Sequence, residues 1–435
     1  WRRRWWLWCW RCAGDQSDVA GACGVVHSHL FCLDALCVLW VRSARRQSGA
    51  WLHERRDLSR KCLEGVPEVS PKRFCPQNEE NHQAGTTMTN VLDTLKVPLA
   101  IGTLQWGTTP IDHKIINPRG VISEAQAQQI VQEFTKAGVQ VWDTAEGYGG
   151  GTSEKRLSRC LKDSNDAIFM TKFLPVPWRG FWESDFENAV RQSCLRLGVK
   201  TIPLYLLHTP VHWRPLEYWV KCAARCKELG VIQYLGLSNC NASQVRRAVE
   251  AGKEFGIDVV LNQVHFSLLD YNSPALLEMA TTCRELNVKI VAFSPIGQGL
   301  LTDKLTQDNF GSNRPAKMLR LEWDDLAALR AGLKRMSAKY EKTMAQVAIQ
   351  WCIRHKVVPL VGCRSLEQAK DTLGSLGWEM EAKDVETLNN LALDRSTLQS
   401  PEWRRSIFVT LFGIIMVVCR TMDALGFGMV KEASV

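Results

Sequence analysis

The 435-residue sequence has no concentrated run of positive charge in its middle, although its formal net charge is +9. Residues 1–87 contain 13 Lys and Arg against 9 Asp and Glu, a balance of +4. Between residues 88 and 400 the basic side chains are scattered and form no stripe. Proteins that bind nucleic acid usually cluster Lys and Arg on one face. The absence of such a cluster argues against nucleic-acid binding as the main function.

The sequence also lacks a metal-binding spacing of His and Cys. Seven of the 16 Cys precede residue 88, and the others lie at irregular spacings in apolar segments. Cys222 and Cys226 are close in the sequence, within VKCAARCKELG, but no His or Cys with zinc spacing follows them nearby. We therefore expect buried thiols and predict no metal site.

Methionine is missing from residues 1–87, and the first methionine is Met88. This segment begins WRRRWWLWCWRC and holds seven of the 17 Trp. Its arginines suit an organelle-targeting extension, whereas its acidic residues, its Trp and Cys, and its few Ser do not. The alternative, which we favour, is sequence upstream of the true translation start. Either way we predict a disordered N-terminal extension over residues 1–87.

The C-terminal region contains one long apolar run, SIFVTLFGIIMVVC, at residues 406–419. Arg404 and Arg405 precede it and Arg420 follows it. A helix of this length covers about 20 Å, less than the roughly 30 Å of a hydrocarbon core. A short or tilted membrane anchor, an interfacial segment, and a tail packed on the domain or on a partner all stay open. Residues 401–435 are thus predicted to be an apolar tail.

Between residues 95 and 395 short apolar runs alternate eight times with longer segments of helical periodicity. Most runs are apolar at consecutive positions, which is typical of strands buried on both faces of a parallel sheet. The predicted strands are 97–105, 139–144, 167–173, 201–208, 232–239, 259–266, 289–296 and 357–363.

The segments between the strands carry helix start and stop signals. One starts at Ser123, and four end at Gly138, Gly198, Gly230 and Gly256. Successive βα units with right-handed crossovers close on themselves, so residues 88–400 are predicted to form an α/β fold, the (β/α)8 TIM barrel. A doubly wound open sheet is the alternative, but no GxGxxG opens the first helix.

The stretch VWDTAEGYGGGTSEKRL, residues 141–157, joins the second predicted strand to a helix. It admits a plain interpretation as a turn, because glycines permit positive φ. In that interpretation Thr152 or Ser153 caps the following helix, and Glu154 lies in its first turn, where a carboxylate favours the helix dipole.

Four chemically active side chains nevertheless follow neighbouring predicted strands. Asp143 and Tyr148 follow the second strand, Lys172 closes the third, and His208 closes the fourth. In a (β/α)8 barrel the working groups lie where strands end and βα loops begin. A carboxylate, a phenol, an ammonium and an imidazole are therefore expected at one rim.

These four groups suit the reduction of a carbonyl. Hydride delivery to carbon leaves charge on oxygen, so the site needs a proton donor, for which we predict Tyr148. The Lys172 ammonium is expected to lower the pKa of this phenol, and Asp143 to hold the lysine in place. His208 is expected to hydrogen-bond the substrate oxygen. The hydride has to come from a cofactor.

Residues 95–395 resemble an aldo-keto reductase. DTAEGYGGGTSEKRL is similar to the strand-two motif of that family, and MTKF and LYLLH to its lysine and histidine segments. GLSN, LNQVHFSLL, FSPIGQGLL and VGCRSLEQAKDTLG are similar to its cofactor-binding stretches. The resemblance implies an NADPH-dependent oxidoreductase of aldehydes or ketones, with Tyr148 as general acid/base and Asp143, Lys172 and His208 as its catalytic partners.

The resemblance also assigns contacts to NADP(H). An arginine fork suits the adenosine 2'-phosphate, although a plain surface charge is the alternative for Arg364. Thr372 stands where the family usually has asparagine near the adenine, which leaves the preference for NADPH over NADH open. The implied contacts are Ser238, Asn239 and Gln263 at the nicotinamide amide; Ser294, Pro295, Ile296, Gly297, Gln298, Gly299 and Leu300 along the pyrophosphate; and Gly362, Arg364, Ser365 and Gln368 at the adenosine end.

Two other classes of function stay open. A regulatory subunit could keep the nucleotide-binding barrel and sense its ligand for a membrane partner, although such a binder has no need of Tyr148. A Schiff-base aldolase would use Lys172 as nucleophile and would need no nicotinamide.

The substrate is not defined beyond a small carbonyl compound. Trp106, Trp178, Trp182 and Trp213 follow predicted strands and are candidates for a partly apolar pocket, with loop packing as the alternative. Residues 298–322 are predicted to be a long polar loop, as a functional lid or as disorder. The predicted compartment is the cytoplasm; a plastid, another organelle, or membrane association through residues 406–419 are alternatives. The oligomeric state stays open.

Overall fold

The computed structural model describes residues 90–107, 121–394, 410, 411, 413 and 414. The chain divides into two units, Trp1–Ala84 and Gly85–Val435. The predicted N-terminal extension, residues 1–87, lies outside the described residues, as does almost all of the predicted tail, residues 401–435. The interpretations of these two segments stay predictions.

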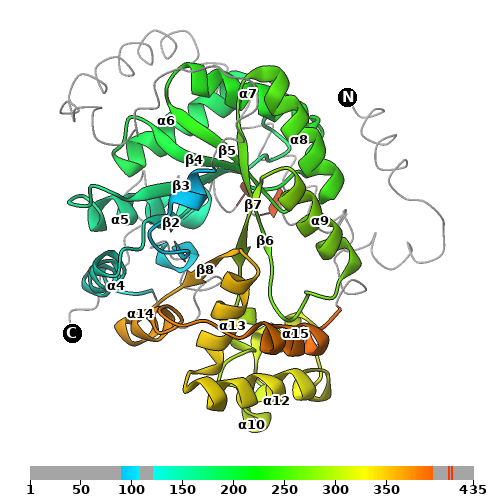
Figure 1. Ribbon diagram of the computed structural model, residues 1–435. Helices are drawn as coiled ribbons and strands as arrows, with labels where there is room; N and C mark the ends of the chain where they lie inside the picture. The colour runs from blue at the N-terminus through cyan, green and yellow to red at the C-terminus, as the bar shows by residue number, and fades with distance from the viewer. Residues whose placement is uncertain (1–89, 108–120, 395–409, 412, 415–435) are drawn as a thin grey trace, which may run out of the picture. The chain divides into compact units, whose positions relative to one another are not determined.

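Eight parallel strands close into a barrel in chain order, and β8 pairs with β1 (Figure 1). Each predicted strand contains an observed one, so the predicted (β/α)8 barrel is confirmed. The strands are β1 Ala100–Gly102, β2 Val141–Asp143, β3 Ile168–Phe173, β4 Ile202–Leu207, β5 Ile232–Ser238, β6 Val259–His265, β7 Lys289–Phe293 and β8 Val358–Gly362.

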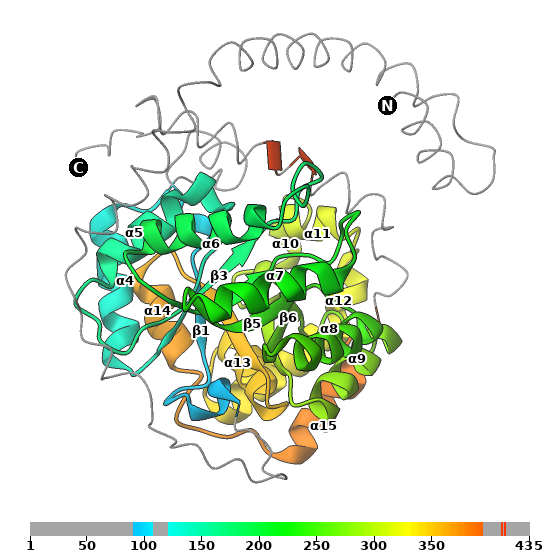
Figure 2. The same ribbon diagram turned by 90° about the horizontal axis from the view of Figure 1, so that it is seen from above.

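Helices surround the barrel, as the view from above shows (Figure 2). The α-helices are α4 Glu124–Lys136, α5 Thr152–Cys160, α6 Ser184–Leu197, α7 Leu216–Glu228, α8 Ala242–Phe255, α9 Pro274–Glu285, α10 Gln307–Phe310, α11 Arg314–Met318, α12 Trp323–Tyr340, α13 Met344–Arg354, α14 Leu366–Leu373 and α15 Ala382–Leu391. Short 3-10 turns are η2 Val91–Thr94, η3 Leu104–Trp106, η5 Tyr148–Gly151 and η6 Gly297–Gly299.

Local sequence signals set the helix ends. Ser123 caps α4, since its hydroxyl accepts a hydrogen bond from the backbone of Gln126 and the Gln126 side chain bonds back to Ser123. This reciprocal pair satisfies two donors that the first turn leaves open. At the C-terminal ends of α6 and α8, Gly198 and Gly256 adopt φ of 70° and 79°, a left-handed conformation in which glycine commonly ends a helix.

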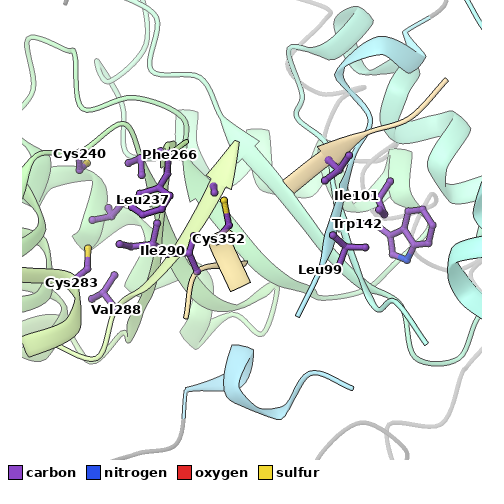
Figure 3. Packing of buried hydrophobic residues seen from close by; sticks show 14 of the residues in the cluster. Leu99, Ile101, Trp142, Leu237, Cys240, Phe266, Cys283, Val288, Ile290 and Cys352 are labelled. Atoms are coloured by element: carbon purple, nitrogen blue, oxygen red, sulfur yellow. The ribbon is translucent and has the colours of Figure 1, made fainter. Parts of the chain in front are cut away.

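The apolar core has two layers. Side chains that point into the barrel, among them Met170, Leu206 and Leu261, fill its interior. A larger layer lies between the strands and the helices, where Trp142 and Phe266 pack (Figure 3). The eight cysteines among the described residues are free thiols and are buried, as expected from their apolar settings.

One end of the barrel is closed by η2. Leu92 packs into the interior cluster, and the buried Asn90 side chain donates hydrogen bonds to the carbonyls of Val260 (2.7 Å) and Asn287 (2.9 Å). These contacts seal the end at which the strands begin. The opposite end, where the strands finish, is left to the loops that carry the candidate site.

Residues 298–322, predicted to be a long polar loop, include the end of η6 and the short helices α10 and α11, so this segment is partly helical. The guanidinium of Arg330, on α12, donates hydrogen bonds to the carbonyls of Leu300, Thr302 and Leu305. A long polar segment can therefore fold, because one nearly buried cation satisfies its backbone acceptors.

Four residues of the predicted tail, 410, 411, 413 and 414, are described, and all four are helical. Gly413 is buried, and a Cβ added there would clash with Val176 and lie 2.9 Å from the Trp178 ring. In the part of the chain that the structure describes, no helix is long and apolar enough to span a bilayer.

The barrel interior makes a specific demand on Gly236, in β5. A Cβ there would lie 2.6 Å from Leu206 Cγ and 3.0 Å from Leu261 Cδ1. We expect Gly236→Ala to lower the free energy of unfolding by about 1–3 kcal/mol, measured by chemical denaturation, because the packed interior cannot absorb the methyl group. In a Leu206→Ala background the same substitution should cost clearly less; an equal cost in both backgrounds would contradict the packing explanation.

Candidate active site

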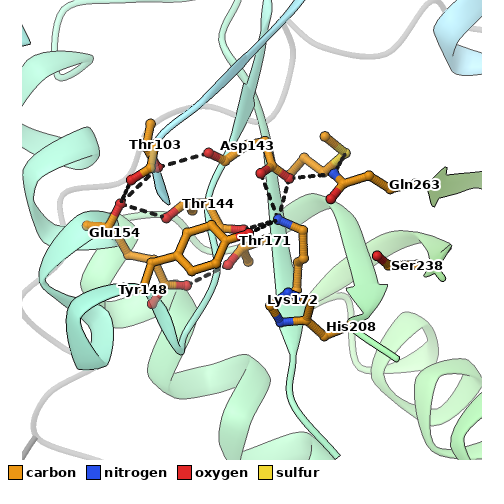
Figure 4. A network of polar contacts seen from close by, with 12 residues as sticks. Thr103, Asp143, Thr144, Tyr148, Glu154, Thr171, Lys172, His208, Ser238 and Gln263 are labelled. Carbon is orange, nitrogen blue, oxygen red and sulfur yellow. Dashed lines mark hydrogen bonds and ion pairs between the residues drawn. The ribbon is translucent and has the colours of Figure 1, made fainter. Parts of the chain in front are cut away.

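The four predicted catalytic side chains meet at the carboxyl ends of β2, β3 and β4 (Figure 4). Asp143 ends β2, Tyr148 begins η5, Lys172 is the penultimate residue of β3, and His208 directly follows β4. Asp143, Tyr148 and Lys172 are buried. Parallel pairing of β2 with β3 and of β3 with β4 fixes this arrangement, because it brings the three strand ends to one rim.

Lys172 lies at the centre of the group. Its Nζ donates hydrogen bonds to Asp143 Oδ2 (2.7 Å), the Thr144 carbonyl (2.8 Å) and Tyr148 Oη (3.1 Å). An ammonium group has three N–H donors, so these three oxygens satisfy it. Gln263 Nε2 donates to Asp143 Oδ1 (2.8 Å), so the carboxylate is fixed on both sides.

His208 lies beside the phenol. The rings of Tyr148 and His208 are 5.8 Å apart and meet edge to face. One ring nitrogen of His208, Nδ1, is buried and has no hydrogen-bond partner among the described residues. Since buried polar atoms are normally paired, this nitrogen is suited to a ligand atom bound next to Tyr148.

The electrostatics of this group follow from burial and from the central ammonium. Burial raises the pKa of Asp143, against the opposing effects of Lys172 and Gln263. Burial by itself lowers the pKa of Lys172, but the Asp143 carboxylate and the Tyr148 oxygen more than offset it, so that pKa is raised. Burial and the Lys172 charge lower the pKa of His208 to about 3. The imidazole is therefore neutral at physiological pH.

Lys172 does lower the pKa of Tyr148, as expected. The net pKa of Tyr148 is nevertheless raised, because other contributions are larger. Burial raises the pKa of Tyr148, Lys172 opposes the rise, and Asp143 adds to it, so the pKa lies above its ordinary value. Burial was not visible in the sequence, which is why the net direction differs. A phenol in this setting holds its proton at neutral pH.

The glycine-rich bend after Asp143 differs from the predicted turn. Gly151, with φ of 105°, is the N-cap of α5, and no side chain caps the helix. The predicted capping by Thr152 or Ser153 is wrong, because Thr152 is already helical and the Ser153 hydroxyl donates to the Thr103 carbonyl (2.9 Å). Glu154 does lie in the first turn. The bend therefore anchors to β1 instead of capping itself.

A second buried ion pair lies beside the four predicted catalytic side chains and was not expected from the sequence. Glu146 has no exposure to solvent, and its carboxylate pairs with Arg179 and accepts a hydrogen bond from the Leu174 backbone (2.9 Å). The pair ties the bend that carries Tyr148 to the loop that follows β3. The available signal was an acid between Asp143 and Tyr148, but its partner lies 33 residues away.

The residues implied at a nicotinamide lie on β5, β6 and the start of the next loop. Ser238 is buried at the end of β5 and is the register partner of Gln263 on β6. Asn239 has a positive φ of 61° and donates from Nδ2 to the His208 carbonyl (3.2 Å). Phe293 ends β7, and its ring lies 5.3 Å from the His265 ring in an edge-to-face contact.

The implied pyrophosphate segment follows β7. Ser294, Gly297, Gln298 and Gly299 adopt φ between 54° and 100°. Within the bend, Gly297, Gly299 and Leu300 donate their N–H groups to the carbonyls of Ser294, Ile296 and Gly297. Pro295, Ile296 and Leu300 belong to the same bend, and Leu300 is buried. The contact of this bend with a pyrophosphate therefore stays a prediction.

The implied adenosine end follows β8. Gly362 ends the strand, and Ser365 is the N-cap of α14, where its hydroxyl accepts from the Gln368 backbone (3.3 Å). The Arg364 backbone donates to Gln368 Oε1 (2.8 Å). A helix N-terminus flanked by an arginine is suited to a phosphate group. Thr372 is buried in α14, with Oγ1 3.7 Å from Cys363 Sγ.

The four tryptophans proposed as pocket walls divide into two kinds. Trp106 is fully buried and donates from Nε1 to the Cys363 carbonyl (3.2 Å), so it belongs to the core. Trp178, Trp182 and Trp213 are 41%, 68% and 45% exposed. The structure thus supports loop packing for Trp106 and leaves the other three on the surface.

The chain is similar to proteins named as reductases and to a solved aldo-keto reductase structure. Pyridoxal reductase, chloroplastic, from Arabidopsis thaliana is 29% identical over 70% of this chain and 86% of its own length. A Schizosaccharomyces pombe protein named aldo-keto reductase yakc [NADP(+)] is 27% identical over 59% of this chain and 79% of its own. The holo form of an aldo-keto reductase from Bacillus halodurans superposes with a TM-score of 0.56 at 22% identity, over 70% of this chain and 95% of that one.

A family model gives the decisive match. Residues 98–392 match the model described as the aldo/keto reductase family. This range begins just before β1 and ends just after α15, so it includes the whole barrel with its four central side chains. The chain therefore belongs to the aldo-keto reductase family.

Proposed function

We propose that this protein reduces aldehydes or ketones to alcohols with NADPH, and that Tyr148 donates the proton. The observation that carries the proposal is the buried contact of Tyr148 Oη with Lys172 Nζ. Asp143 in turn accepts a hydrogen bond from the same Nζ. This contact places a protonated phenol beside a cation at the end of the barrel where such folds hold their reacting groups.

Each side chain has a defined task in this reaction. Bound NADPH would supply the hydride, and negative charge would then develop on the carbonyl oxygen. The Tyr148 hydroxyl gives its proton to that oxygen, and the Lys172 ammonium stabilises the phenolate that is left. Neutral His208 orients the same oxygen, because an imidazole with a pKa of about 3 can donate a hydrogen bond without carrying charge.

The chain's own residues also support the choice of cofactor. Ser238, Asn239 and Gln263 would hold the nicotinamide amide, and the bend from Ser294 to Leu300 the pyrophosphate. Arg364 and Ser365 would bind the 2'-phosphate that distinguishes NADPH from NADH. The NADP(+) in the name of the S. pombe relative points the same way. Pyridoxal, the aldehyde in the name of the Arabidopsis relative, is a suitable first substrate.

The alternatives fit the site less well. A Schiff-base aldolase needs a neutral lysine, whereas the pKa of Lys172 is raised and its three donors are engaged. A regulatory subunit that only binds nucleotide has no use for a buried phenol that contacts an ammonium. Turnover therefore discriminates between the proposals.

Tyr148→Phe should reduce turnover of pyridoxal and simple aldehydes by at least about 100-fold, because the proton donor is removed. NADPH binding, measured by fluorescence titration, should be retained, since the phenol hydroxyl is not among the proposed cofactor contacts. Retained turnover would contradict the mechanism. Wild-type protein that binds NADPH without any turnover would favour the regulatory subunit.

The pH dependence of the reverse reaction should respond to the two charges beside Tyr148. Alcohol oxidation needs the phenolate, so its rate rises with pH through the pKa of Tyr148. Lys172→Met removes a cation that lowers this pKa and should move the rising limb to higher pH. Asp143→Asn removes an anion that raises it and should move the limb to lower pH.

The measurement is kcat for oxidation of the product alcohol across neutral and alkaline pH. Lys221→Met, which alters an exposed lysine on α7, is the matched control and should leave the limb in place. Shifts of the two site variants in the same direction would show that their charges do not act on Tyr148 as proposed.

Arg364→Gln should weaken NADPH binding by about tenfold or more and leave NADH binding nearly unchanged, because charge-assisted hydrogen bonds to the 2'-phosphate are lost. Fluorescence titration with each cofactor gives both affinities. Lys370→Gln, which removes an exposed charge on α14, the helix that follows Arg364, is the control. Equal weakening for both cofactors would assign Arg364 a role other than recognition of the 2'-phosphate.

A further inference from the structure

A cluster of exposed aromatic side chains lies on the loops that follow β3 and β4. We call Trp178, Phe181, Trp182 and Trp213 the aromatic rim; their exposed fractions are 41%, 51%, 68% and 45%. The Phe181 ring is 6.0 Å from the Trp182 ring and 5.3 Å from the Trp213 ring. These three rings form a continuous apolar surface, which a water-exposed monomer rarely presents.

The rim is held outward by contacts behind it. Trp213 Nε1 donates to the Pro177 carbonyl (2.9 Å), and Arg214 Nε donates to the Gly180 carbonyl (2.8 Å). The Arg214 guanidinium also lies 4.5 Å from the centre of the Trp213 ring. Both loops are thus bonded to each other, so the rings cannot easily turn inward. The exposure of these rings therefore follows from the fixed conformation of the two loops.

The proposed reduction does not account for these rings. Substrate and cofactor contacts are assigned to side chains at the strand ends, and Trp182 is too exposed to serve as the wall of an enclosed pocket. The rim nevertheless lies on the loop side of the barrel, the side on which Tyr148 and His208 lie.

The described part of the C-terminal tail joins this surface. Gly413 is buried against Val176 and the Trp178 ring, whereas Leu411 and Ile414 are 54% and 42% exposed. The tail therefore covers part of Trp178 and adds two exposed aliphatic side chains next to it. The apolar surface continues from the barrel loops onto the tail.

The sequence around these residues has the chemistry of a membrane interface. Residues 406–419 contain no charged side chain, and Arg404, Arg405 and Arg420 flank them. Tryptophan is enriched at the boundary between lipid and water. An apolar segment too short to cross a bilayer can lie in this boundary, and flanking arginines are attracted to anionic headgroups.

We propose that the aromatic rim and the apolar tail together bind the surface of an anionic phospholipid bilayer. Rings from two loops insert among the headgroups, and Leu411 and Ile414 of the tail add exposed aliphatic side chains. The arginines that flank residues 406–419 in the sequence favour anionic over neutral headgroups. The loop side of the barrel then faces the bilayer. The choice of substrate is the one step that rests on the proposed reduction: the site then receives carbonyl compounds that are dissolved in the membrane.

The experiment is co-sedimentation of the full chain with two kinds of vesicle, phosphatidylcholine alone and equal parts phosphatidylcholine and phosphatidylserine. We expect binding to the anionic vesicles. Phe181→Ser/Trp182→Ser in the rim and Leu411→Ser/Ile414→Ser in the tail should each weaken it by about tenfold or more, because each removes two exposed apolar side chains. All variants keep residues 1–87, so that segment cannot cause the difference.

Leu195→Ser/Leu229→Ser is the matched control. These leucines are 50% and 38% exposed and lie near the C-terminal ends of α6 and α7, at the opposite end of the barrel. Their replacement should leave vesicle binding unchanged. NADPH titration of each variant shows whether the barrel is intact and does not depend on lipid, so failure of membrane binding and failure of the proposed function are read separately.

Three results would overturn the proposal. Failure of the wild-type chain to sediment with anionic vesicles would exclude a bilayer as the partner. Undiminished sedimentation of the rim and tail variants would place lipid binding elsewhere in the chain. A dimer in size-exclusion chromatography that the rim variant abolishes, without vesicle binding, would assign the surface to a second copy of this chain.

Discussion

The ammonium group of Lys172 is fully buried, and its charge is matched by Asp143 and satisfied by three oxygen atoms. A buried charge without such partners costs several kcal/mol, so Lys172 is tolerated only where β2 and β3 run side by side. The same geometry that stabilises the buried charge places the ammonium group against the Tyr148 hydroxyl. One ammonium group therefore links the ends of β2 and β3 to the phenol.

Keeping Tyr148 in this contact requires a fixed bend after β2, and three separate contacts supply it. Ser153 bonds to the end of β1, Glu146 pairs with Arg179 in the loop after β3, and three glycines with positive φ allow the tight path between them. Loss of any one would let the phenol move away from Lys172. The bend is thus specified from both neighbouring strands, which explains why so short a segment carries so many polar contacts.

The barrel and the four central residues could be predicted because both depend on order along the chain. Apolar runs mark the strands, and parallel closure brings consecutive strand ends together, so Asp143 and Lys172 meet wherever the barrel forms. Contacts that depend on packing were missed. The Ser153 hydroxyl donates to the carbonyl of Thr103, which directly follows β1 and lies 50 residues earlier, and Trp106 is buried instead of lining a pocket. The raised pKa of Tyr148 likewise depends on a degree of burial that no local pattern reports.

The loop after β3 serves the interior and the surface at once. Arg179 turns inward to the buried Glu146, while Trp178 and Trp182, on either side of it in the sequence, are exposed. An arginine bound to a buried carboxylate fixes the loop backbone, and its guanidinium also lies 4.8 Å from the centre of the Phe173 ring. The loop consequently cannot collapse to hide its aromatic side chains without breaking an ion pair in a low-dielectric setting. The aromatic rim therefore stays exposed because the same loop is anchored to the buried Glu146.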